Sequence, residues 1–222
     1  FTANLAAQDI KWLGHTKLIL KSDNEVALKA LEKQIRVLLS QTGQEIQQAG
    51  QEEPASYESQ SNGGTEVGIR NVRGMMRTLK LCLEARIEKY IPITHPIIAW
   101  LLEHTCTLLN ARVKGTDGLT PWARIKGRPF NQRLVGFGEK VLYKLPGKGP
   151  RHDPDGNIGT RWLEAIFLGY HRSSNSYVVG TDTGTTTARS LQRKPLTDRW
   201  VHEDIAAIKA TPWSQRERPD RE

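Results

Sequence analysis

The chain has 222 residues, of which 37% are hydrophobic and 25% charged, so it can bury a core and does not have the composition of a disordered protein. Its net charge is +8 and its isoelectric point is about 9.6, which favours an anionic partner such as nucleic acid without specifying one. The two cysteines, Cys82 and Cys106, belong to no CxxC pair or Cys/His cluster, which argues against a structural zinc site. No apolar run approaches the roughly 20 residues that span a bilayer, and the first residues lack a signal-peptide pattern. We therefore expect no membrane association and a nuclear or cytoplasmic protein that is not secreted.

The amino-terminal part of the chain alternates helical and strand-like patterns. Apolar residues at helical intervals predict a helix over residues 1–13 that ends near Gly14. The run KLILK predicts a short strand, and the apolar spacing over residues 25–39 predicts an amphipathic helix. Residues 41–64 are polar, rich in Gln and interrupted by Gly and Pro, so we expect a loop there.

Residues 65–87 have a strong helical pattern with two stripes. One stripe is apolar and consists of Ile69, Val72, Met76, Leu79 and Leu83. The other begins with a carboxylate and continues with four cations: Glu66, Arg70, Arg73, Arg77 and Lys80. Further helices are predicted over residues 96–110 and from Thr120 onward. The order of strand, helix, loop and several helices fits the second half of an α/β layer domain.

Beyond Phe130 the pattern changes to short β-rich runs separated by Gly, Pro, Asn and Asp. FGEKVLYKL, RWLEAIFLGY, SYVVGT and TTARSLQRK have the lengths and spacing of strands in a small β-barrel. From about Leu196 the charge is mixed, and we expect a short helix followed by a frayed end.

Two acidic residues allow both a structural and a catalytic interpretation. Asp23 follows the KLILK strand, where open α/β sheets place functional side chains, but Asp also commonly caps a helix such as the one beginning at Glu25. Glu66 lies in the first turn of its helix, where the helix dipole favours a carboxylate. The stripe behind it is nearly all positive, whereas a solvated helix face usually mixes both signs. Such a stripe could follow a phosphate backbone, with the carboxylate at its head holding a metal.

Paired carboxylates from a strand end and a helix start are suited to Mg²⁺ or Mn²⁺, which prefer hard oxygen ligands. Two such ions can activate a water or a 3′-hydroxyl and stabilise the leaving oxygen of a phosphodiester. His95 and His104 stand apart from these carboxylates, and we expect them to be packing or surface residues.

Several segments, in order, resemble a known family. KSDNE, QSNGGTE with the basic helix after it, and LLNARVKGTDGLTPWARIKGRPF resemble the integrase core of copia-type retrotransposons. The β-rich runs resemble the SH3-like domain that follows that core, so the resemblance covers roughly Leu18 to Pro195. It implies an α/β fold with a truncated RNase H-like integrase core over residues 1–130, an SH3-like β-barrel over residues 131–196 and a charged tail over residues 197–222.

The resemblance also implies a site. The family binds two divalent metals through an Asp, Asp, Glu triad; Asp23 matches the second Asp and Glu66 the Glu, so Mg²⁺ or Mn²⁺ is the implied cofactor. Gln60 and Asn62 fall in the loop before the Glu and would position the DNA end. The implied phosphate-binding residues are Arg70, Arg73, Arg77 and Lys80.

Two departures from the family pattern matter. Glu25 stands where many relatives have Gly, so the backbone after Asp23 is expected to differ. The strand with the first Asp of the triad is expected upstream of Phe1, and Asp9 is a poor substitute because it lies in the predicted helix before the KLILK strand. We therefore expect a fragment that is inactive alone, since two carboxylates would neutralise the transition-state charge poorly.

Three functions remain open at this point. The chain is either part of an integrase that, when complete, trims 3′ ends and joins them to target DNA, or a non-catalytic nucleic-acid-binding remnant of a transposable element. The first implies element ends and target DNA as partners and a homo-oligomer as the working form. A protein-interaction module built on the β-barrel is the third possibility.

Overall fold

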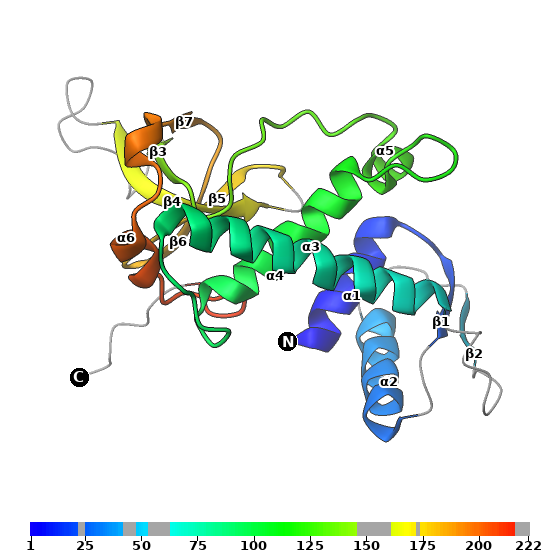
Figure 1. The fold of residues 1–222 in the computed structure, drawn as a ribbon. Coiled ribbons are helices and arrows are strands. Elements are labelled where there is room, and N and C mark those ends of the chain that lie inside the picture. Colours follow the sequence, from blue (N-terminus) through cyan, green and yellow to red (C-terminus); the bar gives the residue numbers. More distant parts are fainter. Residues whose placement is uncertain (22–24, 42–47, 53–62, 146–160, 172–173, 216–222) are drawn as a thin grey trace. The chain divides into compact units, whose positions relative to one another are not determined.

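The computed structural model describes residues 1–21, 25–41, 48–52, 63–145, 161–171 and 174–215. The chain is a mixed α/β protein, as predicted, and its elements are labelled in Figure 1. It forms two compact units, and the division between them falls within one long helix, between Asn71 and Val72.

The first unit contains three of the predicted elements. Helix α1 (Thr2–Leu13) ends at Gly14, whose φ of 75° is the left-handed conformation that glycine adopts without strain. Strand β1 (Lys17–Lys21) is the KLILK run, and helix α2 (Val26–Ser40) is amphipathic. These three elements share a small core, which includes Ala3, Ala7, Leu18, Leu20, Ile35 and Leu39.

The first unit also contains a strand that the sequence did not predict. Strand β2 (Gln48–Glu52) pairs with β1 in parallel, with Lys17 opposite Gln48 and Lys21 opposite Glu52. The prediction of a continuous loop over residues 41–64 is therefore wrong for these five residues. Their sequence, QAGQE, has no β-branched or aromatic side chain and no apolar alternation. Backbone pairing with β1, rather than local propensity, accounts for the strand.

Three further helices confirm the predicted pattern. Helix α3 spans Gly63–Ile87 and helix α4 spans Ile97–Arg112. Helix α5 (Pro121–Lys126) begins where the sequence places it, because the Thr120 hydroxyl accepts a 3.1 Å hydrogen bond from the Ala123 N–H and proline is favoured at the first helical position.

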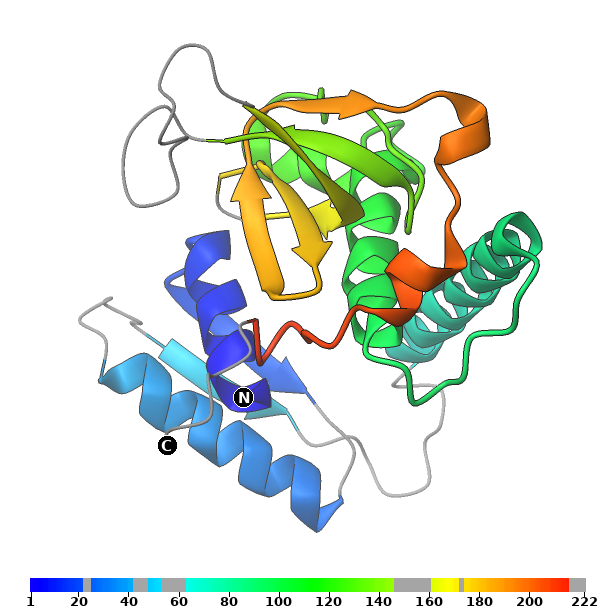
Figure 2. The ribbon, with the colours of Figure 1, turned by 90° about the vertical axis from the view of Figure 1, so that its left-hand side faces the viewer.

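The second unit contains a five-stranded antiparallel sheet in the order β6-β5-β4-β3-β7. Its strands are β3 (Lys140–Lys144), β4 (Trp162–Tyr170), β5 (Tyr177–Thr181), β6 (Gly184–Ala188) and β7 (Leu191–Arg193). All four predicted β-rich runs therefore form strands, and TTARSLQRK supplies two of them. Figure 2 shows how strongly these strands curve.

Helices α3 and α4 share a core with this sheet. Leu83 and Leu101 are almost fully buried in the cluster that contains Ile166 and Leu168 of β4. At Gly138, a Cβ would lie 2.7 Å from Leu83 Cδ1, so a larger residue would force the Leu83 side chain to move. The predicted domain boundary after residue 130 therefore falls between elements that share a core in this unit.

Residues beyond 196 are part of the same unit up to Gln215. A 3₁₀ turn (η2, Leu196–Asp198) precedes helix α6 (His202–Ala206), and Ile205 and Ile208 are 1% and 2% exposed. The Trp100 indole N–H donates a 2.8 Å hydrogen bond to the Ala210 carbonyl. The short helix predicted after about Leu196 is confirmed by α6, and apolar side chains within this mixed-charge stretch complete the core.

Candidate nucleic-acid interface

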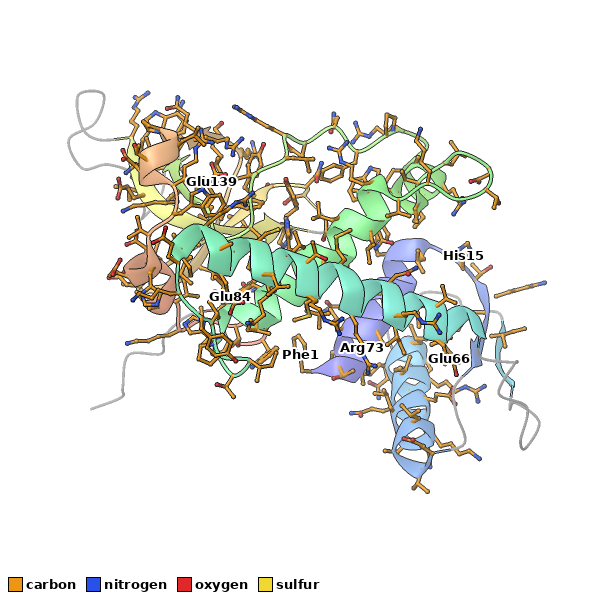
Figure 3. All side chains as sticks on the ribbon, in the orientation of Figure 1. Phe1, His15, Glu66, Arg73, Glu84 and Glu139 are labelled. Atoms are coloured by element: carbon orange, nitrogen blue, oxygen red, sulfur yellow. The ribbon has the colours of Figure 1, made fainter. Side chains whose placement is uncertain are left out.

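Helix α3 carries the cations that the sequence predicts to contact DNA. Four members of the predicted stripe are exposed: Glu66, Arg70, Arg73 and Arg77. At 3.6 residues per turn they fall within an arc of roughly 60° and extend over about 17 Å of the helix axis. Figure 3 labels Glu66 and Arg73 on this helix. We call the three arginines the cationic face of α3.

The three guanidinium groups of the cationic face have no partner among the residues that the structure describes. No described residue forms an ion pair or a side-chain hydrogen bond with Arg70, Arg73 or Arg77. An exposed cation without an intramolecular carboxylate keeps its charge available to an external anion. The arrangement therefore suits the contact with a polyanion that the sequence predicts.

Lys80 lies at the end of the same stripe in a different environment. Its ammonium is 2.5 Å from Glu84 Oε1 and 4.5 Å from the centroid of the Tyr90 ring, and its side chain is 19% exposed. Although partial burial raises the pKa of Glu84, the Ile91 N–H and the Lys80 ammonium lower it more, and the net pKa lies below the usual value. The charge of Lys80 is therefore paired within the protein, so we do not include Lys80 in the cationic face.

The apolar stripe of α3 is buried over only part of its length. Leu83 is 2% exposed, and Met76 and Leu79 pack against the same core. Ile69, predicted in the same stripe, is 47% exposed. The prediction is thus confirmed where α3 lies in the second unit, because there the sheet and α4 supply a surface to pack against.

The remaining predicted site residues lie outside the described part of the chain. These are Asp23, Gln60 and Asn62. The described residues contain no group of three or more His, Cys, Asp or Glu side chains placed to hold a metal. Glu66 is exposed and has no side-chain partner among the described residues, so its carboxylate oxygens are open to a hard cation.

The buried ion cluster in the second unit was not predicted from the sequence. The Glu139 carboxylate is fully buried and accepts two hydrogen bonds from Arg193, at 2.6 and 2.7 Å, while Arg199 lies 3.4 Å away. The Gly136 N–H donates a further hydrogen bond to it, at 3.2 Å. The cluster joins the residue before β3, Glu139 (labelled in Figure 3), to β7 and to the residue after η2. Its place inside the unit indicates a structural role.

His95 and His104 were expected to be packing or surface residues, and their positions in the structure agree with this. His104 is 3% exposed and lies among aromatic rings, and His95 Nδ1 accepts a 3.2 Å hydrogen bond from the Ile97 N–H at the start of α4.

The comparisons with known proteins identify no relative: the chain matches no protein-family model, and no curated protein is significantly similar to it. Among the helices that the structure describes, none has both the length and the apolar character needed to cross a bilayer.

Proposed function

We propose that this chain is the part of a copia-type retrotransposon integrase that contains the second Asp and the Glu of the catalytic triad, and that it binds DNA through the cationic face of α3. The observation that carries the proposal is the row of exposed arginines without partners in the described part of the chain, which begins one turn after Glu66. On the chain alone, the function is nucleic-acid binding without catalysis.

The dimensions of the cationic face suit a phosphate backbone. Arg70 and Arg77 are seven residues apart, which corresponds to about 10 Å along a helix axis. Phosphates of one DNA strand follow each other every 3.4 Å along the duplex axis, so the three guanidinium groups can reach phosphates over about three steps. Arginine is well suited to this contact because its planar fork of donors matches phosphate oxygens.

Glu66 and Asp23 are the proposed ligands of Mg²⁺ or Mn²⁺. When bound, such a metal polarises phosphodiester oxygens and lowers the pKa of an attacking water or hydroxyl. The role of this chain's own residues is to bind: Glu66 presents carboxylate oxygens at the head of the arginine row. By the same resemblance, the DNA partners are element ends and target DNA, and the working form is a homo-oligomer.

The binding proposal is tested by reversing charges on the cationic face. Binding of a labelled DNA duplex of about 20 base pairs should weaken by at least about tenfold in the double variant Arg73→Glu/Arg77→Glu. The matched control is Lys114→Glu/Arg128→Glu, which makes the same change in net charge at exposed positions of the second unit. Equal losses in the two variants would show that DNA responds to net charge only, and the proposed interface would then be wrong.

A second assay separates DNA binding from catalysis. The chain is incubated with a blunt donor duplex, a plasmid target and Mn²⁺, and the products are resolved by size. We expect DNA binding without 3′ trimming or strand transfer. Products that disappear in Asp23→Asn or Glu66→Gln would show instead that the two carboxylates are sufficient for chemistry.

A further inference from the structure

A groove of about 760 Å³ opens on the five-stranded sheet of the second unit. It is formed by the end of β3, the residues before β5, strand β6 and the turn between β6 and β7. Its lining includes Tyr143, Lys144, Ser176, Thr187, Arg189 and Ser190.

The lining of the groove is cationic and rich in hydroxyl groups. Lys144 and Arg189 are exposed, and the described residues that line the groove include no carboxylate. No described residue forms an ion pair with either cation. An anionic ligand in the groove would therefore meet two positive charges that no carboxylate in the described part of the chain neutralises.

The edge of β6 adds a row of backbone groups. In the β5–β6 hairpin, Thr181 pairs with Gly184 across a two-residue turn, so alternate β6 residues direct their N–H and C=O groups away from β5. Thr185 is one of them, and its N–H donates a 2.9 Å hydrogen bond to the Gln215 carbonyl. Thr187 is the next, and no described residue accepts from its N–H.

Gln215 shows that the outward-facing groups of this edge can bond to the backbone of another segment. Its carbonyl receives hydrogen bonds from both the N–H and the hydroxyl of Thr185, the latter at 3.2 Å. The next outward-facing position along the strand, Thr187, also lines the cationic groove. One ligand can therefore pair its backbone with the strand edge and place its negative charges beside the two cations.

We propose that this groove binds an extended acidic peptide from a partner protein, which adds a strand to the β6 edge at Thr187 and places carboxylates against Lys144 and Arg189. A peptide fits better than nucleic acid for two reasons. A strand edge pairs with peptide N–H and C=O groups, a recurrent mode of peptide recognition. The aromatic ring in the lining, Tyr143, is only 9% exposed and offers little surface for stacking of bases.

The test uses the whole chain and a fluorescein-labelled peptide of about eight residues with alternating Glu and Val, long enough to pair as a strand. Two control peptides have Gln in place of Glu, or N-methyl groups on alternate residues so that pairing is blocked. Binding should weaken at least about tenfold for both control peptides, and to the same degree in the double variant Lys144→Glu/Arg189→Glu. The double variant Lys114→Glu/Arg128→Glu changes net charge equally outside the groove and should keep full affinity.

Hydrogen exchange gives a readout that does not depend on a variant. The acidic peptide should slow exchange of the Thr187 amide, which an adventitious charge contact would leave unchanged. The proposal is overturned by a Thr187 amide that stays unprotected, or by affinity that survives in Lys144→Glu/Arg189→Glu. It is also overturned if an oligodeoxythymidine binds more tightly than the peptide with the same dependence on Lys144 and Arg189, because the groove would then be a nucleic-acid surface.

Discussion

Protonation of His104 should destabilise the second unit as the pH falls. The imidazole is 3% exposed, and its ring centroid lies 5.3 Å from that of Phe137, 5.6 Å from Phe167 and 6.1 Å from Tyr170. Its Nδ1 atom is buried without a hydrogen-bond partner among the described residues. Burial accordingly lowers the pKa of His104 from 6.5 to about 4.

The sign of the effect follows from proton binding in the two states. Between pH 6.5 and pH 4 the unfolded chain binds a proton at this histidine and the folded chain does not, so the free energy of unfolding decreases as the pH falls through this window. The difference of about 2.5 between the unfolded and folded pKa corresponds to about 3 kcal/mol lost by pH 4. At pH 7 the contribution is fully retained.

The assay is urea unfolding at pH 7 and at pH 4, followed by tryptophan fluorescence. His104→Phe changes packing equally at both pH values but removes the titrating group, so its loss of stability between the two should be smaller than that of the wild type by about 3 kcal/mol. His15→Gln, at an exposed position, is the control and should behave like the wild type. Equal losses in the wild type and His104→Phe would refute the reasoning.

Other perturbations test individual contacts of the second unit. Glu139→Gln should lower the free energy of unfolding by about 3 kcal/mol in urea titrations, because Arg193 would lose the buried carboxylate that neutralises it; an unchanged midpoint would contradict this role. Trp100→Phe should cost about 1 kcal/mol in the same titration, because the Ala210 carbonyl loses its donor, and no loss would mean that water replaces the bond. Thr120→Ala should accelerate hydrogen exchange at the amide of residue 123, consistent with about 1 kcal/mol for a helix cap; unchanged exchange would show that the cap is dispensable.

Local sequence patterns were sufficient for most of the helices and strands. Gly14 and Thr120 mark helix ends through their own backbone or side-chain chemistry, so neighbouring residues alone locate them. Strand β2 was not predictable in this way, because QAGQE becomes a strand only through pairing with β1, which lies more than twenty residues earlier. Patterns read within a short window do not contain that information.

The candidate site was also only partly predictable from local sequence patterns. The spacing of Arg70, Arg73 and Arg77 predicts a shared exposed face, and the structure places all three there. The different environment of Lys80 depends on Tyr90, beyond the end of the helix, so helical periodicity could not predict it. The ion pair with Glu84 follows the i,i+4 rule and could have been anticipated.

The packing of the second unit depends on contacts between distant segments. Trp100 and Ala210 are joined by a hydrogen bond across more than a hundred residues, and the apolar residues of α6 complete a core begun by α3 and α4. The mixed charge of this segment did not predict that its apolar residues belong to that core. The predicted domain boundary followed the change of pattern after Phe130 and the resemblance, and neither carries information about shared cores.

The salt dependence of DNA binding tests the cationic face most directly. The logarithm of the association constant is measured by fluorescence anisotropy against the logarithm of salt concentration, for the wild type, Arg73→Ala and Lys80→Ala. We predict that Arg73→Ala reduces the slope by about one, because its guanidinium is free to bind a phosphate. Lys80→Ala should leave the slope nearly unchanged, because Glu84 already neutralises that cation. Binding that is independent of salt, or equal slopes for the wild type and Arg73→Ala, would contradict the proposed interface.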